Sequence, residues 1–296
     1  MVMAASGSSK LKRTSNGIEE MDRHGWAARM YLAAYGTRLG VRVNDPAVLE
    51  RLPDHLPPGW EASSDHEVDI LYSLVVGGDG SGNGSRRCHR VYAGAAQVAC
   101  TPDLEQALDT LGSHLELVVA SNVTERLFVH AGVVSWRGQA IVMPGRSLTG
   151  KTTLLAALLE AGATYYSDEF AIFDRQGWVW PYPRRLCVRD AAGQPARKYT
   201  PEELGGQPGV APVPVGLIVV TEYRPGARWH PRPLSPGRAL LALLENTVAA
   251  RIQPETALAT LRQLVLGARA IKSKRAEANQ VARHLLNYFP LPRMAT

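Results

Sequence analysis

The sequence predicts an α/β fold in which a smaller N-terminal α+β domain precedes a larger domain of alternating strands and helices. Apolar runs of strand length alternate after residue 127 with segments whose apolar residues recur at helical spacing. A shorter mixed region of strands and one helix comes before them. The 296 residues are 45% apolar, which is enough to bury a substantial core. We therefore divide the chain into a disordered basic tail (1–24), a small domain (25–125) and a main domain (126–296).

The composition and charge exclude several classes of protein. The net charge is +6, from 33 basic and 27 acidic residues spread along the chain. This charge suits an anionic ligand but is too diffuse for a nucleic-acid surface. No stretch has the length and hydrophobicity of a signal peptide or a membrane span, so we expect a cytoplasmic protein without a membrane partner. Cys88, Cys100 and Cys187 form no close pair, which indicates neither a metal site nor a disulfide framework and fits a reducing cytosol.

The small domain shows strand signals followed by one helix signal. Residues 68–76 are a strand candidate, and the glycine-serine run 77–87 predicts a flexible hairpin loop before a partner at 89–100. The segment 101–123 has leucines at spacings of three and four, with Thr101 as the expected N-cap. A helix is therefore expected to lead into the main domain.

The main domain opens with "LFVHAGVVSWRGQAIVMPG" (127–145), two apolar strands separated by the turn "WRGQ". A helix is expected over 151–162, closed by Gly162 at a C-cap position. The following stretch, "ATYYSDEFAIFD", predicts a short strand that carries acidic residues. Residues 213–223 predict a buried strand, and the last part of the chain, from 236 to 286, predicts helices.

A glycine-rich motif joins the second apolar strand to the helix. Its pattern is G-x-x-x-x-G-K-T, formed by Gly145, Gly150, Lys151 and Thr152. The glycines let backbone N–H groups turn toward a phosphate, the lysine spans the β- and γ-phosphates, and the hydroxyl can ligate Mg²⁺. The alternative is a glycine turn that caps an ordinary helix, but the strand before and the helix after favour a site for ATP and Mg²⁺. The other residues expected at the nucleotide are Arg146, Ser147, Leu148, Thr149 and Thr153.

An acidic pair and a histidine are the candidates for chemistry. Asp168 and Glu169 follow the expected helix and can return beside Thr152. One carboxylate could hold Mg²⁺ and the other could accept a proton from an attacking hydroxyl, or the pair could be a solvated strand end. His130 lies in an apolar run, where it is either a core histidine bonded to a carbonyl or a partner that tunes the catalytic carboxylate.

Two arginines after a Pro-Tyr-Pro segment could stabilise charge on a transferred phosphoryl group. Arg184 and Arg185 come sixteen and seventeen positions after Asp168, and either could reach the γ-phosphate or an acidic substrate. The alternative is a basic surface patch. We take Arg185 as the catalytic candidate.

At these residues the sequence resembles the catalytic domain of HPr kinase/phosphorylase, and more closely the HPr-kinase-related proteins that include lasso-peptide kinases. The resemblance covers roughly residues 126–235 and rests on "FVHAGVV", "PGRSLTGKTTL", "AGATYYSDEFAIFD", "PYPRRL" and "VGLIVVTEYRPG". It implies a P-loop kinase domain of the HPr kinase C-terminal type. It also implies that Asp168 acts as the base toward a serine hydroxyl and that His130 supports the acidic pair.

The sequence departs from the HPr kinase pattern in three ways. The loop ends in Lys-Thr where that family usually has Lys-Ser, which exchanges one hydroxyl for another. The acidic pair is Asp-Glu instead of Asp-Asp, which affects how a metal is held. The later glycine-rich signature of the reverse reaction is not found, so neither phosphorylase activity nor a hexamer is expected, and HPr is not an expected substrate.

We therefore expect an ATP- and Mg²⁺-dependent kinase that transfers the γ-phosphoryl group to a hydroxyl, foremost a serine of a peptide or protein. A polyol or sugar kinase uses the same chemistry and remains open, although the basic, proline-rich segment 180–235 looks more like a docking surface than a lid. An NTP-hydrolysing switch protein is a third alternative. It would need a water-orienting residue and a switch segment, and neither is recognisable. A homo-oligomer is also left open.

Overall fold

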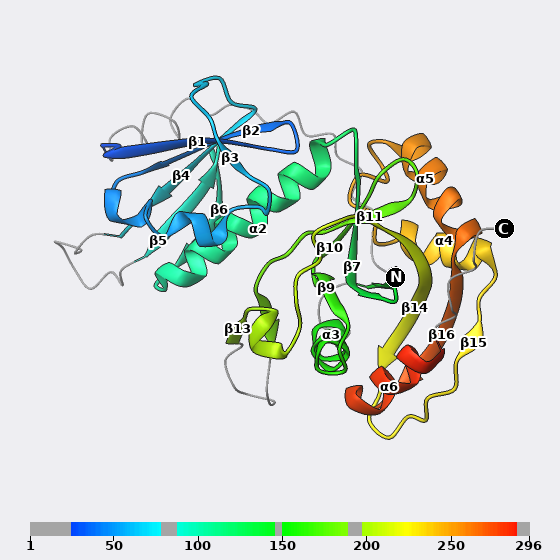
Figure 1. Cartoon of the computed structure of the whole chain (residues 1–296). Coiled ribbons are helices and arrows are strands. Elements are labelled where there is room, and N and C mark those ends of the chain that lie inside the picture. Colours follow the sequence, from blue (N-terminus) through cyan, green and yellow to red (C-terminus); the bar gives the residue numbers. More distant parts are fainter. Residues whose placement is uncertain (1–24, 78–87, 146–149, 189–196, 289–296) are drawn as a thin grey trace, which may run out of the picture. The chain divides into compact units, whose positions relative to one another are not determined.

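The computed structural model describes residues 25–77, 88–145, 150–188 and 197–288, and Figure 1 shows its elements. The tail expected at 1–24 and nearly all of the loop expected at 77–87 lie outside the described residues. The chain forms two compact units, one ending at Val119 and the other beginning at Ala120. The division falls within helix α2 (Leu104–Asn122).

The first unit is built on a six-stranded sheet with the order β3-β1-β2-β4-β5-β6. Strands β2 and β4 run parallel, and the other neighbours run antiparallel. The strands are β1 (Ala28–Ala34), β2 (Thr37–Val43), β3 (Glu61–Ala62), β4 (Ile70–Val75), β5 (His89–Ala93) and β6 (Ala96–Thr101), with short 3-10 turns at Pro46–Val48 and Leu52–His55.

The expected hairpin in this unit is present, but its second arm is itself a hairpin. Strand β4 pairs with β5, and β5 then turns at Gly94 (φ 57°) to pair with β6. This second turn places Cys100 opposite Arg90, and Cys88 and Cys100 form a disulfide with their Cα atoms 5.8 Å apart. The expectation of no disulfide was therefore wrong. The two cysteines are twelve positions apart in the sequence, and the pairing of β5 with β6 brings them together.

Helix α2 is confirmed, with a different cap from the expected one. Oδ1 of Asp103 accepts from the backbone N–H groups of Glu105 (2.9 Å) and Gln106 (3.4 Å). Thr101 instead accepts from the N–H of Asp103, one step before the helix. The negative charge of an aspartate also interacts favourably with the positive end of the helix dipole, which explains why Asp103 and not Thr101 is the N-cap. The buried side of the helix includes Leu108, Leu111 and Leu115.

The second unit contains an eight-stranded mixed sheet, which confirms the α/β class. The order is β11-β10-β7-β8-β14-β16-β15, with β9 paired to β7 and a further pairing of β11 with β14. Strands β8, β14 and β16 run parallel. The strands are β7 (Leu127–Trp136), β8 (Gln139–Pro144), β9 (Thr164–Ser167), β10 (Phe170–Phe173), β11 (Trp178–Trp180), β14 (Val213–Tyr223), β15 (Arg232–Pro233) and β16 (Arg269–Arg275); a separate pair is β12 (Leu186–Val188) with β13 (Arg197–Tyr199), followed by a 3-10 turn at Glu202–Leu204.

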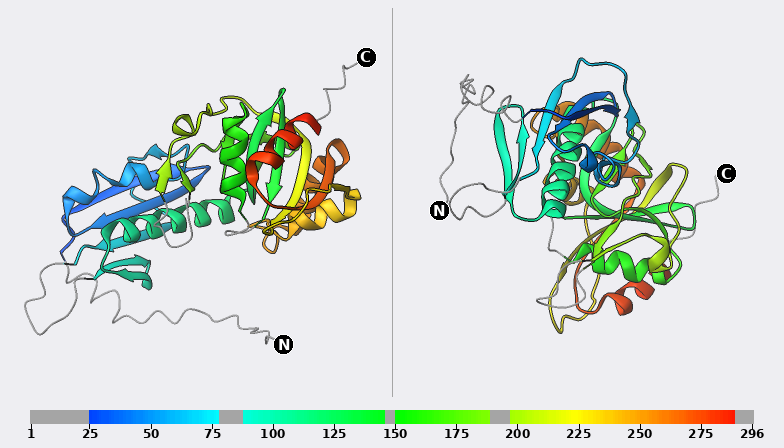
Figure 2. Two further views of the ribbon diagram at one scale, coloured as in Figure 1. Left: turned by 90° about the horizontal axis from the view of Figure 1, so that it is seen from below. Right: turned by 90° about the vertical axis from the view of Figure 1, so that its left-hand side faces the viewer.

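Helices pack on both faces of this sheet (Figure 2). Helices α3 (Lys151–Glu160) and α6 (Ala278–Tyr288) bury leucines on one face, against residues such as Ile141. Helices α4 (Pro236–Leu244) and α5 (Pro254–Gly267) bury theirs on the other, against the next residue of β8, Val142. Neighbouring residues of one strand thus enter opposite cores, as expected for a strand covered on both sides.

Two expectations for the second unit were wrong in detail. The stretch expected as one acidic strand is two strands, β9 and β10, and the acidic pair Asp168 and Glu169 lies in the turn between them. The C-terminal part is not wholly helical, because β16 separates α5 from α6 and pairs with β14. In the part of the chain that the structure describes, no helix is long and apolar enough to cross a membrane.

Candidate functional site

The site is built around the loop that leaves strand β8 and enters helix α3. The loop starts at Gly145, whose N–H donates to the carbonyl of His130 at 3.1 Å. It ends at Gly150, which has a φ of 80°, a left-handed conformation that favours glycine. Nζ of Lys151 reaches back to donate to the carbonyl of Gly145, so the first helical residue closes the loop onto its own beginning. Arg146, Ser147, Leu148 and Thr149, all predicted to contact the nucleotide, lie outside the described residues.

The N-terminus of α3 is open toward this loop. Its N-cap residue is Gly150, which has no side chain to accept from the first N–H groups. The first N–H groups of a helix carry the positive end of its dipole and attract anions. Thr152 is half-buried in the first turn, whereas Thr153 is exposed. The helix start therefore suits a negatively charged ligand.

The acidic turn between β9 and β10 is fixed beside β7. Oγ of Ser167 accepts from the N–H groups of Glu169 (3.3 Å) and Phe170 (3.1 Å) and holds the turn. The carbonyl of Glu169 accepts from the N–H of Ala131 at 3.1 Å. Both acids therefore directly precede Phe170, the residue that pairs with His130.

His130 connects the acidic turn with the loop. Its Nδ1 lies 3.3 Å from Oε1 of Glu169, and its ring packs on Phe170 with the ring centroids 4.5 Å apart. Burial opposes ionisation of Glu169, but the hydrogen bond from His130 and the positive charge of Arg184 outweigh it, and the pKa of Glu169 is lowered. Glu169 is therefore ionised at neutral pH and acts as the fixed negative charge of the site.

Asp168 has the opposite character. It is only 8% exposed and accepts a hydrogen bond from the hydroxyl of Tyr165 at 3.1 Å. Burial raises the pKa of Asp168 to about 6; the charge of Arg184 opposes this rise and the charge of Glu169 adds to it. A carboxyl group with such a pKa can gain and lose a proton near neutral pH, which is what a general base needs.

Lys151 lies within electrostatic range of both acids. Burial lowers the pKa of Lys151, and the charges of Glu169 and Asp168 act against that lowering. These interactions connect the start of α3 with the acidic turn, although seventeen positions of sequence separate Lys151 from Asp168. Lys151, Asp168, Glu169 and His130 thus meet at the carboxyl end of β8, the edge at which α/β sheets bind ligands.

The two candidate arginines have different surroundings. Arg184 is half-buried, its charge lowers the pKa of Asp168 and of Glu169, and its carbonyl lies 3.1 Å from the hydroxyl of Tyr165. The side chain of Arg185 is exposed. The sequence analysis took Arg185 as the candidate, whereas the burial and the charge interactions favour Arg184.

A cavity of about 880 Å³ opens beside the loop. Pro144 and Gly145 contribute to its wall, together with Thr221 at the end of β14 and the segment that follows α4. That segment is tied to the site, because the carbonyl of Asn246 accepts from the N–H of His130 at 2.8 Å. The cavity therefore borders the residues at which the loop begins and is large enough for part of a substrate.

The donors present suit a magnesium ion bound mainly through phosphate. Among the residues that the structure describes, no group of three or more His, Cys, Asp or Glu side chains is placed to hold a metal. Magnesium usually takes one or two carboxylates and completes its shell with phosphate oxygens and water. Glu169, Asp168 and the hydroxyl of Thr152 are hard oxygen donors of this kind.

Two supporting residues were not anticipated from the sequence. Tyr165 positions the carboxylate of Asp168, and Ser167 holds the acidic turn. The available signal was a hydroxyl residue directly before the acidic pair, which is typical of a side chain that bonds backbone N–H groups in a turn. No such signal exists for the tyrosine.

Comparison with known proteins finds similarity only among solved structures. No protein-family model matches the chain, and no curated protein matches it. A solved structure, the Hpr(Ser) kinase/phosphatase from Coxiella burnetii, is similar at 13% sequence identity and a TM-score of 0.31. The match covers 54% of this chain and 95% of that one.

Proposed function

We propose that the chain is an ATP- and Mg²⁺-dependent kinase that transfers the γ-phosphoryl group to a hydroxyl, with a serine of a peptide or protein as the first candidate. The observation that carries this proposal is Asp168, a buried carboxyl group with a pKa of about 6 beside Lys151. A site that only bound nucleotide would have no use for a carboxyl group poised to take a proton.

The loop and the start of α3 bind the polyphosphate in this proposal. The N–H groups of the helix start face the β-phosphate, and Lys151 bridges the β- and γ-phosphates. Thr152 and Glu169 would hold a magnesium ion, which would supply positive charge to the same phosphates. Support comes from the glycine at the N-cap of α3, which has no side chain to occupy the first N–H groups, and from the lowered pKa of Glu169.

The transfer step needs one base and one further cation. The acceptor hydroxyl attacks the γ-phosphorus, a new O–P bond forms, and the bond from the γ-phosphorus to the bridging oxygen of ADP breaks. The hydroxyl proton passes to Asp168. In a loose transition state this proton moves late, so the base mainly orients the hydroxyl, with an effect of about a hundred- to ten-thousand-fold. Arg184, which is half-buried and close to both acids, stabilises charge on the equatorial oxygens.

The acceptor approaches from the side of the cavity that begins at Gly145. In-line transfer places the acceptor opposite the leaving ADP, and the cavity borders Gly145, where the loop begins. Its volume of about 880 Å³ accommodates a short peptide segment or a polyol. Both acceptors therefore enter the test, together with water as the acceptor of a switch protein.

The test is γ-labelled ATP offered with a serine peptide library, with folded proteins and with polyols. Label on a hydroxyl acceptor, lost in Lys151→Ala, supports the kinase and identifies the acceptor class. Label recovered only as inorganic phosphate favours the NTP-hydrolysing switch. A chain that neither binds nor consumes ATP would overturn the proposal.

A further inference from the structure

One buried cation beside the loop has no part in the reaction described above. Arg275 is the last residue of β16 and is only 1% exposed. Its Nη2 donates to the carbonyl of Gly150, and its Nη1 donates to the carbonyl of Ala276 at 3.1 Å. Its Nε is buried and, among the described residues, has no hydrogen-bond partner. The two partners that it does have are neutral carbonyls.

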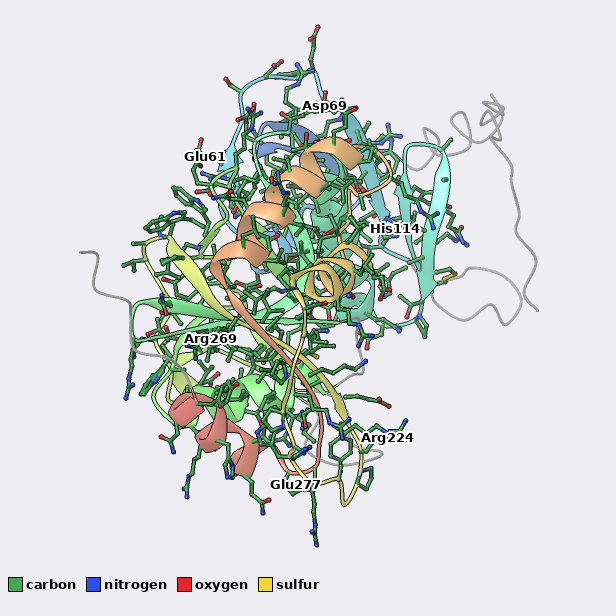
Figure 3. The ribbon with its side chains drawn as sticks, turned by 90° about the vertical axis from the view of Figure 1, so that its right-hand side faces the viewer. Glu61, Asp69, His114, Arg224, Arg269 and Glu277 are labelled. Atoms are coloured by element: carbon green, nitrogen blue, oxygen red, sulfur yellow. A yellow bond between two sulfur atoms is a disulfide. The ribbon has the colours of Figure 1, made fainter. Side chains whose placement is uncertain are left out.

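The charge of this guanidinium is poorly compensated. Its guanidinium carbon lies 5.5 Å from the centre of the Tyr223 ring, and the carboxyl group whose charge acts on it is that of Glu277, an exposed residue at the same end of β16 as Arg224 (Figure 3). Burial accordingly lowers the pKa of Arg275, but an arginine stays protonated at any physiological pH. A buried cation without a carboxylate is costly unless an anion is brought close to it. This charge lies directly behind the start of α3.

Arg275 also fits the backbone at the end of the loop. A Cβ atom built on Gly150 would lie 2.4 Å from Nη2 of Arg275, so the guanidinium occupies space that any other residue would need. The carbonyl of Gly150 that accepts from Arg275 also accepts from the N–H of Leu154 in the first helical turn. Fixing this carbonyl fixes the peptide plane between Gly150 and Lys151, and with it the direction of the Lys151 N–H.

We propose that Arg275 is a positioning residue for polyphosphate. It holds the Gly150–Lys151 peptide so that the first N–H groups of α3 face the β- and γ-phosphates, and its buried charge is offset only when those phosphates bind. The inference rests on the proposed nucleotide site. It adds a residue 125 positions away from Gly150, on a strand that carries none of the other site residues.

The inference is tested by calorimetry with three probes: inorganic tripolyphosphate, ATP·Mg²⁺ and AMP. Arg275→Met keeps most of the side-chain volume and removes the charge. The variant should bind tripolyphosphate and ATP·Mg²⁺ about tenfold or more weakly, because one charge-assisted interaction is lost. Its affinity for AMP should change by less than about twofold. Arg275→Lys keeps the charge and should recover most of the lost affinity. Arg224→Met is the matched control, because Arg224 is exposed and paired with Glu222, and it should change nothing.

Three results would overturn the inference. The first is an unchanged affinity for tripolyphosphate in Arg275→Met while Lys151→Ala binds it more weakly. This result rejects the positioning role of Arg275 and leaves the proposed nucleotide site intact. The second is an equal loss for AMP and ATP, which indicates general disorder of the fold. The third is a wild-type chain that binds no polyphosphate, which removes the proposed function as well. Should Arg275→Met fail to fold, Arg275→Lys decides: a loss for ATP·Mg²⁺ as large as that of Lys151→Ala contradicts the role of the charge.

Discussion

The pKa of Asp168 is set by its burial, by a hydrogen bond from Tyr165 and by the charges of Arg184 and Glu169. Its neighbour Glu169 is less buried and has a lowered pKa, because His130 donates to it and Arg184 lies near it. Two adjacent acids of similar intrinsic acidity are thus separated into one fixed charge and one group that exchanges its proton near neutral pH. This separation of the two pKa values gives each acid its proposed role.

Asp168→Asn should leave ATP·Mg²⁺ affinity nearly intact and lower phosphoryl transfer by about a hundred- to ten-thousand-fold, because an amide cannot take the hydroxyl proton. In the wild type, transfer should rise with pH through about 6, where Asp168 ionises, and then level off. The measurement is initial rate against pH with calorimetric affinities in parallel, with Glu160→Gln, an exposed acid at the end of α3, as the control. Transfer at the native rate in Asp168→Asn would place the base elsewhere.

The same burial should make Asp168 costly for the stability of the protein without nucleotide. Folding raises the pKa of Asp168 from 3.8 to about 6. The stability that this group contributes is therefore fully present at a pH below 3.8 and is lost as the pH rises through about 6. At pH 8 Asp168→Asn should therefore raise the free energy of unfolding, by about 1–3 kcal/mol. Below pH 4 the gain should vanish. Urea unfolding at the two pH values tests this, and a less stable variant at pH 8 would contradict the assigned burial.

At the scale of the element, the loop and helix α3 carry the nucleotide. The sequence predicted this helix, its end at Gly162 and the preceding hairpin, because local spacing and glycine positions define all three. It did not predict the turn that holds Asp168 and Glu169, since "TYYSDEFAIF" is apolar on both sides of the acids and resembles one continuous strand. The side chain of Ser167 interrupts that strand by bonding two backbone N–H groups.

Strand β16 was missed for a different reason. Its sequence, RAIKSKR, has alternating exposed and buried residues, with Ile271, Ser273 and Arg275 buried. Basic residues occupy the exposed positions of β16, so the segment lacks the apolar run that identified β14. Helices also precede and follow the strand, which favoured a helical prediction for the whole region. Its pairing with β14 is a long-range contact that no local pattern encodes.

Thr152 and Thr153 provide a matched pair at the start of α3. Thr152→Val removes a hydroxyl from a half-buried position beside the loop, and Thr153→Val removes one from the exposed side of the same turn. We expect Thr152→Val to raise the Mg²⁺ concentration needed for half-maximal ATP binding by about tenfold, the value of one lost ligand contact, with Thr153→Val unchanged. Magnesium titrations at fixed ATP measure this. Equal behaviour of the two variants would remove the threonine from the metal site.

At the scale of the whole molecule, the chain consists of two compact units, and every proposed site residue belongs to the second. The α/β class followed from the order of apolar segments. The disulfide did not, because it depends on the pairing of β5 with β6 in the first unit. It also bears on the cytoplasmic expectation, since disulfides persist mainly in oxidising surroundings.

Thiol titration tests the disulfide directly. Protein purified without reductant and unfolded in denaturant should show one reactive thiol, that of Cys187, and three after reduction. Cys187→Ser should lower both numbers by one. Three reactive thiols before reduction would show that Cys88 and Cys100 are reduced and would support the cytosolic expectation.

The central claim is that the start of α3 and the acidic turn form one site for ATP and its metal ion. Ferrous ion in place of magnesium, with ascorbate and peroxide, cleaves the backbone next to the bound metal, and mass spectrometry locates the cuts without any knowledge of the acceptor. We expect ATP-dependent cuts both beside Thr152 and at Asp168–Glu169, suppressed by excess Mg²⁺ and absent in Lys151→Ala. Cuts that do not depend on ATP, or that fall at only one of the two segments, would contradict the claim.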